Sequence, residues 1–198
     1  LGANALLGSP LTQRQMLTLA TAIEGHPDNV APAMLGGFVT SVYDEGLVYT
    51  VKKDIDPDLA FAAFVPDFRL LTAKARAALP EMVSHKDAVY NLSRAALATA
   101  AFCDGDYALL GVATKDALHQ RYRLPLIHGG DEVFELAQDL CALGVYISGA
   151  GPTIIAVVHK DDDEFFTRAR AALEKSEALR HFTLYRLLAD NAGAKAES

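Results

Sequence analysis

The stretch EGHPDN, Glu24–Asn29, sets the expectations for this chain. It follows a segment, residues 13–23, whose apolar side chains recur at helical spacing. A glycine and a proline inside the stretch end that helix. Glu24 is then at the helix C-terminus, where the macrodipole disfavours an anion by roughly 0.3–1 kcal/mol. A carboxylate in this unfavourable position suggests a functional role, such as binding a cation. A helix end followed by Asp28 as a helix cap explains the stretch equally well.

Working outward, Thr12 and Gln15 have the spacing of a capping box at the start of the helix. After the stretch we expect three short elements: a helix or turn at 28–35 and hairpin strands at 38–43 and 47–52. An acidic, proline-containing segment at 54–58 predicts a domain boundary.

The rest of the chain alternates between strand and helix patterns. Strands are predicted at 59–65, 145–148, 153–159 and 182–188, and helices at 70–78, 86–102, 107–119, 131–143 and 161–174. This order indicates an α+β fold with a ferredoxin-like (split βαβ) layer and extra helices.

A second candidate site is the glycine-containing stretch Ser148–Thr153. Its glycines allow the backbone close to a ligand, and successive N–H groups can form an anion-binding nest. It is not a Walker loop, because the Gly-Lys-Ser/Thr ending is absent and a strand follows. Taken alone, the stretch is better explained as a hairpin turn.

Arginines near apolar segments form a third feature. Arg94 lies in a mostly apolar helix and needs an anionic partner if it is buried. Arg121 and Arg123 flank Tyr122, and an arginine can bind the carboxylate of an amino acid through two hydrogen bonds. For any single arginine, a solvated helix face or a structural salt bridge is the better-supported alternative.

Composition excludes several classes of function. The 198 residues carry a net charge of −7 without a basic stripe, which argues against a nucleic-acid partner. No apolar run is long enough to cross a membrane, and there is no signal-peptide pattern. Cys103 and Cys141 stand alone, so a zinc or disulfide framework is not indicated, and a reducing cytoplasm is compatible.

The first residues, LGANALL, have the pattern of an apolar helix face, from which we expect that an N-terminal portion is missing.

Together these segments resemble the GHMP small-molecule kinases, and within them the branch that acts on homoserine. The matching segments are EGHPDNVAPA with the following Gly36-Gly37, VYISGAGPT at 145–153, NLSRA at 91–95 and YRLP at 122–125. The resemblance implies that residues 1–56 are the remainder of a ribosomal-protein-S5-like N-terminal domain that binds ATP and Mg²⁺. Residues 57–198 would be the C-terminal domain. The family's ATP-phosphate loop would lie upstream of Leu1, so no ATP-binding residue is assigned, and we expect the chain alone to be inactive.

The resemblance also implies a reaction, the transfer of the ATP γ-phosphoryl group to the side-chain hydroxyl of L-homoserine in cytoplasmic threonine biosynthesis. Glu24 is the implied Mg²⁺ ligand. The implied substrate-binding residues are His26, Asp28, Asn29, Arg94, Arg123, Ser148, Gly149 and Gly151. Asp28 is the catalytic candidate, first as a group that orients the hydroxyl, because a carboxylate is a far weaker base than an alkoxide. Late proton acceptance by Asp28 is a hypothesis.

Two other interpretations stay open. The chain could belong to a GHMP kinase that acts on a different small alcohol, or it could be a non-catalytic ligand-binding or regulatory domain of the same fold. A homodimer also stays open.

Overall fold

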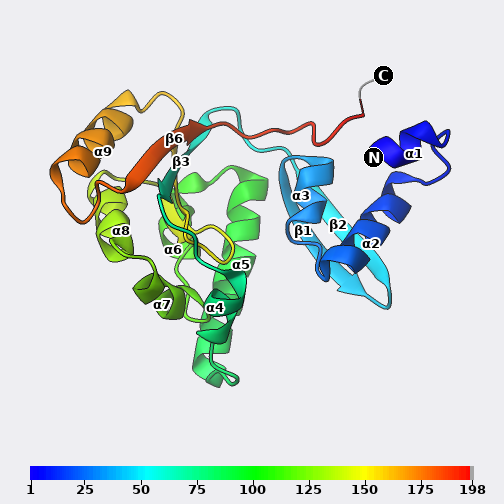
Figure 1. Cartoon of the computed structure of the whole chain (residues 1–198), viewed down its shortest axis with the longest axis horizontal. Coiled ribbons are helices and arrows are strands. Elements are labelled where there is room, and N and C mark those ends of the chain that lie inside the picture. Colours follow the sequence, from blue (N-terminus) through cyan, green and yellow to red (C-terminus); the bar gives the residue numbers. More distant parts are fainter. Residues whose placement is uncertain (197–198) are drawn as a thin grey trace. The chain divides into compact units, whose positions relative to one another are not determined.

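The structure, a computed structural model, describes residues 1–196. It divides into two units, each with its own contacts (Figure 1). The first contains residues 1–56 together with the segment that begins at Ala189, and the second is Pro57–Leu188. The final segment thus packs with the first unit, whereas the sequence places it in the second domain. The assignment of residues 1–56 and 57–198 to the two family domains stays a prediction.

The first unit is built from three helices and a hairpin. These are α1 (Gly2–Leu6), α2 (Gln13–Glu24), α3 (Val30–Leu35), β1 (Phe38–Asp44) and β2 (Leu47–Lys53). The Thr12–Gln15 capping box is confirmed: the Thr12 side chain accepts from the Gln15 N–H, and the Gln15 side chain accepts from the Thr12 N–H. β1 and β2 are antiparallel, with Phe38 opposite Lys53.

A small core holds the first unit together, formed by Leu17, Ala31, Met34 and Val48. The final segment is fixed to it by Asn191, whose side chain accepts from the Ile55 N–H and donates to the Ile55 carbonyl, each at 2.9 Å. Gly36 must be glycine here, since a Cβ would lie 2.5 Å from the backbone nitrogen of Gly193.

The second unit is centred on a four-stranded antiparallel sheet. Its strands are β3 (Leu59–Pro66), β4 (Gly144–Ile147), β5 (Ile154–His159) and β6 (Phe182–Leu187), in the spatial order β4-β5-β3-β6. The helices lie between β3 and β4 and between β5 and β6 in the chain, which is the split βαβ pattern. The predicted ferredoxin-like layer is therefore confirmed.

The helices of this unit are α4 (Thr72–Ala77), α5 (His85–Asp104), α6 (Leu110–Ala113), α7 (Gln120–Arg123), α8 (Gly130–Asp139) and α9 (Asp163–Lys175), with 3₁₀ turns at Tyr107–Leu109 and Leu124–Leu126. Figure 1 shows α8 and α9 together beside the strands. They bury their apolar faces against alternate residues of the sheet; Phe64, Phe165 and Phe166 are among the most buried side chains.

Two predicted helices are wrong in extent. The helix expected at 107–119 ends at Ala113, because the Asp116 carboxylate accepts backbone N–H groups that a helix would use otherwise. The helix expected at 131–143 ends at Asp139, where the chain turns through Cys141 at a φ of 61° to begin β4.

Within residues 1–196, none of the helices combines the length and apolar character that crossing a bilayer requires.

Candidate functional site

The residues proposed from the sequence are divided between the two units. Glu24, His26, Asp28 and Asn29 lie in the first, and Arg94, Arg123, Ser148, Gly149 and Gly151 lie in the second. Each group has its own local geometry.

In the first unit, the candidates occupy the connection between α2 and α3. Glu24 is the last residue of α2 and is exposed, and Gly25 ends the helix with a φ of 92°. Asn29, not Asp28, is the N-cap of α3, and its side chain makes no capping hydrogen bond. The explanation of Asp28 as a simple helix cap is therefore wrong. The Asp28 carboxylate instead lies 3.8 Å from Nδ1 of His26.

The residues present suit a metal ion that takes few of its ligands from the protein. No group of three or more His, Cys, Asp or Glu side chains that could enclose a metal occurs in the part of the chain that the structure describes. Mg²⁺ in phosphoryl-transfer sites usually keeps several waters and takes one or two carboxylates together with substrate phosphates. A single exposed carboxylate such as Glu24 fits that mode of binding.

In the second unit, Arg94 borders a small cavity of about 180 Å³ that polar and apolar side chains line together. Its Nη1 donates to the Tyr90 carbonyl at 3.1 Å, and its guanidinium lies over the Tyr90 ring. Its Nε is buried and finds no hydrogen-bond partner among the described residues. Because an unmatched buried donor costs about 1–3 kcal/mol, this atom is suited to an acceptor from a ligand.

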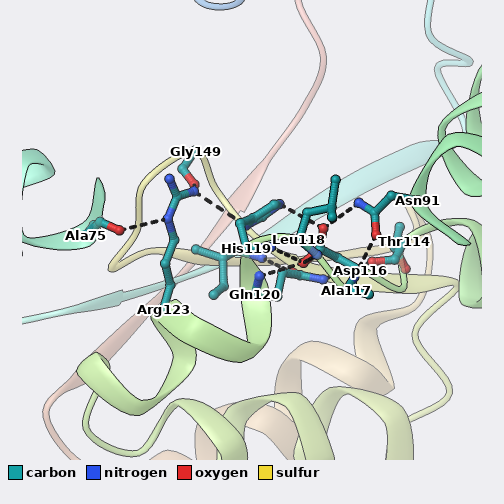
Figure 2. Close-up of polar contacts among 11 residues, drawn as sticks. Ala75, Asn91, Thr114, Asp116, Ala117, Leu118, His119, Gln120, Arg123 and Gly149 are labelled. Carbon is teal, nitrogen blue, oxygen red and sulfur yellow. Dashed lines mark hydrogen bonds and ion pairs between the residues drawn. The ribbon is translucent and has the colours of Figure 1, made fainter. Parts of the chain in front are cut away.

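Arg123 contacts the glycine-containing loop directly. Its Nη1 donates to the Gly149 carbonyl at 2.9 Å, and its Nε donates to the Ala75 carbonyl at 3.4 Å (Figure 2). The loop also has internal hydrogen bonds, from the Gly151 N–H to the Ser148 carbonyl and from the Ser148 N–H to the Thr153 carbonyl, each at 2.9 Å. Arg123 therefore ties this loop to α4.

Asp116 is the centre of a polar network beside Arg123 (Figure 2). Its Oδ2 accepts from three consecutive backbone N–H groups, those of Leu118, His119 and Gln120, at 2.6–3.1 Å. Its Oδ1 accepts from the Asn91 side chain at 2.6 Å. Burial by itself raises the pKa of Asp116, but these hydrogen bonds and the neighbouring His119 outweigh it and hold the pKa below its usual value.

Two neighbours extend this network to the sheet and to Arg123. Gln120 is buried, donates to the Thr114 carbonyl and accepts from the Ile147 N–H at the end of β4. His119 lies between the charges of Asp116 and Arg123. Burial lowers the pKa of His119; Asp116 opposes that shift and Arg123 adds to it.

Sequence reasoning missed Asp116, His119 and Gln120 because it placed the first two inside a helix. The available signal was Asp116 itself, since an aspartate in the middle of an apparent helix often bonds its own backbone and interrupts the helix.

Comparison with known proteins identifies the fold. The family model "GHMP kinases C terminal" matches residues 98–175. A homoserine kinase of Clostridium beijerinckii is 46% identical over 193 residues, which are 98% of this chain and 64% of that protein. This chain has the fold of the GHMP kinases. A second GHMP-type relative, a homoserine kinase of Caldicellulosiruptor saccharolyticus, is 44% identical over 97% of this chain and 62% of its own length.

The GHMP fold is also shared with solved structures. The crystal structure of homoserine kinase from Cytophaga hutchinsonii superimposes with a TM-score of 0.82 at 27% identity, covering 96% of this chain and 62% of that one. The chain thus spans somewhat less than two thirds of the relatives that it matches. The expected α+β GHMP kinase fold is confirmed.

Proposed function

We propose that this protein, in its whole form, transfers the γ-phosphoryl group of ATP to the side-chain hydroxyl of L-homoserine. The product is O-phospho-L-homoserine, an intermediate for threonine synthesis in the cytoplasm. The observation that carries the proposal is the 46% identity to a homoserine kinase along 98% of this chain.

In the second unit, Arg94 and Arg123 bind the substrate carboxylate. The buried Nε of Arg94, without a partner among the described residues, supports this role. Arg123 uses Nε and Nη1 to hold Ala75 and Gly149, so Nη2 is the atom it offers to the substrate. Ser148, Gly149 and Gly151 line the substrate with the exposed or half-buried backbone of their loop.

In the first unit, His26, Asp28 and Asn29 orient the substrate. Glu24 is the residue that would hold Mg²⁺, which supplies charge neutralisation for the transferring phosphoryl group. Asp28 accepts the hydrogen bond of the homoserine hydroxyl and aims its oxygen at phosphorus. Late in the transfer, the proton of that hydroxyl moves to the Asp28 carboxylate.

A coupled ADP-release assay tests the substrate. The protein expressed from its complete reading frame should release ADP with L-homoserine and much more slowly with other small alcohols, mevalonate among them. ADP release with a different alcohol but not with L-homoserine would favour another GHMP kinase. No release with any alcohol would favour a non-catalytic domain.

The Asp28→Asn variant tests the role of the carboxylate. If Asp28 accepts the proton, kcat should fall strongly while KM for L-homoserine changes little, because the amide cannot take the proton but can still accept a hydrogen bond. Turnover close to that of the unmodified protein would exclude an essential carboxylate.

The Arg94→Met variant tests the carboxylate site. Loss of a hydrogen-bonded charge should raise KM for L-homoserine roughly 10- to 150-fold. Arg121→Met is the matched control, since Arg121 is exposed and pairs with Asp87. Equal KM values for the two variants would remove Arg94 from the substrate site.

A further inference from the structure

We propose that Asp116 and His119 are positioning residues for the loop Ser148–Thr153: Asp116 sets the orientation of His119, and His119 orients Arg123, which holds the Gly149 carbonyl. Because it concerns the conformation of the loop alone, this inference does not rest on the proposed function.

The last link is the hydrogen bond from Arg123 to the loop. Nη1 of Arg123 lies 2.9 Å from the Gly149 carbonyl oxygen and 3.4 Å from Nδ1 of His119 (Figure 2). One nitrogen of a planar guanidinium therefore contacts both the loop and the imidazole. A change at His119 alters the direction in which Arg123 donates to the loop.

The middle link is the tautomer of His119. A guanidinium can only donate hydrogen bonds, so its contact with Nδ1 requires a lone pair on that atom and a hydrogen on Nε2. Nε2 lies 3.6 Å from Oδ1 of Asp116, on the side where the carboxylate attracts that hydrogen. The tautomer follows from the partners on the two sides of the ring.

The first link is the immobility of Asp116. Its side chain is only 7% exposed and is held by the backbone of residues 118–120 and by Asn91. Asn91 also accepts from the Ala117 N–H at 2.7 Å, which ties the same turn to α5. Because this carboxylate is held in place, it can determine the orientation of the imidazole ring.

Burial, more than the surrounding charges, favours an uncharged His119. Asp116 and Arg123 contact the ring, and Arg94, Lys115 and Tyr146 line the same cavity of about 180 Å³. Burial lowers the pKa of His119, and Arg123 lowers it further, against the attraction of Asp116. A protonated ring would present an N–H to the N–H of Arg123, so the contact between them requires the neutral form.

Hydrogen exchange of the loop amides tests the proposal without any substrate. His119→Phe keeps the ring volume and removes both nitrogens, so the protected N–H groups of Ser148 and Gly151 should exchange roughly 3- to 10-fold faster, as expected for the loss of about one hydrogen bond. His119→Asn retains an acceptor near the position of Nδ1 and should restore exchange close to that of the unmodified protein. His159→Phe, an exposed residue at the end of β5, is the control.

Unchanged exchange at Ser148 and Gly151 in folded His119→Phe would overturn the proposal, as would His119→Asn behaving like His119→Phe. If His119→Phe fails to fold, the pH dependence of the unmodified protein decides. After correction for intrinsic rates, protection of the two amides should weaken as His119 becomes protonated, and constant protection would contradict the mechanism. Altered exchange in a protein that lacks kinase activity toward L-homoserine would overturn the proposed function but leave this inference standing.

Discussion

At the scale of single residues, the turn that follows α6 depends on one carboxylate. Asp116 accepts from the backbone of residues 118–120 and from Asn91, and each of these donors would lose its partner if the carboxylate were removed. Buried donors without partners are costly, so the turn and the start of α7 are the parts of the second unit most sensitive to this side chain.

Asp116→Ala should lower the free energy of unfolding of the second unit by about 1–3 kcal/mol, the usual cost of leaving buried hydrogen-bonding groups unmatched. Urea unfolding measures the change. Asp106→Ala is the matched control, because Asp106 is exposed and its side chain makes no capping hydrogen bond. Equal effects of the two substitutions would show that the network contributes little.

The lowered pKa of His119 predicts a pH dependence of stability. The unfolded chain, with the histidine near its ordinary pKa of 6.5, binds a proton more readily than the folded chain does. The contribution of the neutral ring is therefore complete above pH 6.5 and is lost as the pH falls toward the lower pKa of the folded state. Between pH 8 and 5, His119→Phe should show a smaller loss of unfolding free energy than the unmodified protein; identical slopes would contradict this.

Only part of the candidate site could be predicted from the sequence. The stretch Glu24–Asn29 could be predicted as a helix end because its glycine and proline act locally. The partners of Arg123 could not, since Ala75 and Gly149 come from distant parts of the chain. Those long-range neighbours decide whether an arginine is exposed to solvent, forms a salt bridge or binds a ligand.

At the scale of elements, the helices and strands that could be predicted are those whose own sequence carries a signal. The capping box begins α2, and the apolar pattern of β3 matches its burial on both faces at the centre of the sheet. The end of α8 was not predicted, because the requirement to begin β4 at Gly144, opposite Val157, is set by pairing with β5.

Helix α9 offers a test of a local signal. Asp162 accepts from the Phe165 N–H at 2.9 Å and caps the helix that places Phe165 and Phe166 in the core. Asp162→Ala should destabilise the second unit by about 1 kcal/mol, as measured by thermal or urea unfolding. The neighbouring Asp161→Ala, at an exposed position before the cap, should have a much smaller effect. A cap that contributes nothing would make the two variants indistinguishable.

At the scale of the whole molecule, the stability of the second unit comes from the layer between its sheet and the helices α8 and α9. Phe64 lies on the central strand β3, is fully buried and pairs in register with Ile154 and Leu184 on the flanking strands. The fold class could be predicted because strand order and helix placement follow from the alternation of patterns along the chain. The packing of the segment after Ala189 with the first unit could not, since it depends on contacts such as that of Asn191 with Ile55.

Phe64→Ala should cost about 3–5 kcal/mol of unfolding free energy, through lost burial and the cavity left behind. Leu71→Ala, at a position 72% exposed, serves as its control and should change stability little. A small effect of Phe64→Ala in urea unfolding would mean that the sheet layer is not the main core.

Identification of the reaction product is the strongest test of L-homoserine phosphorylation by this protein. The protein expressed from its complete reading frame should be incubated with ATP, Mg²⁺ and L-homoserine, and the products analysed by ³¹P NMR and mass spectrometry. We expect a phosphomonoester on the side-chain oxygen of homoserine, formed together with ADP. An unmodified amino acid after prolonged incubation with active, folded protein would contradict the proposed function.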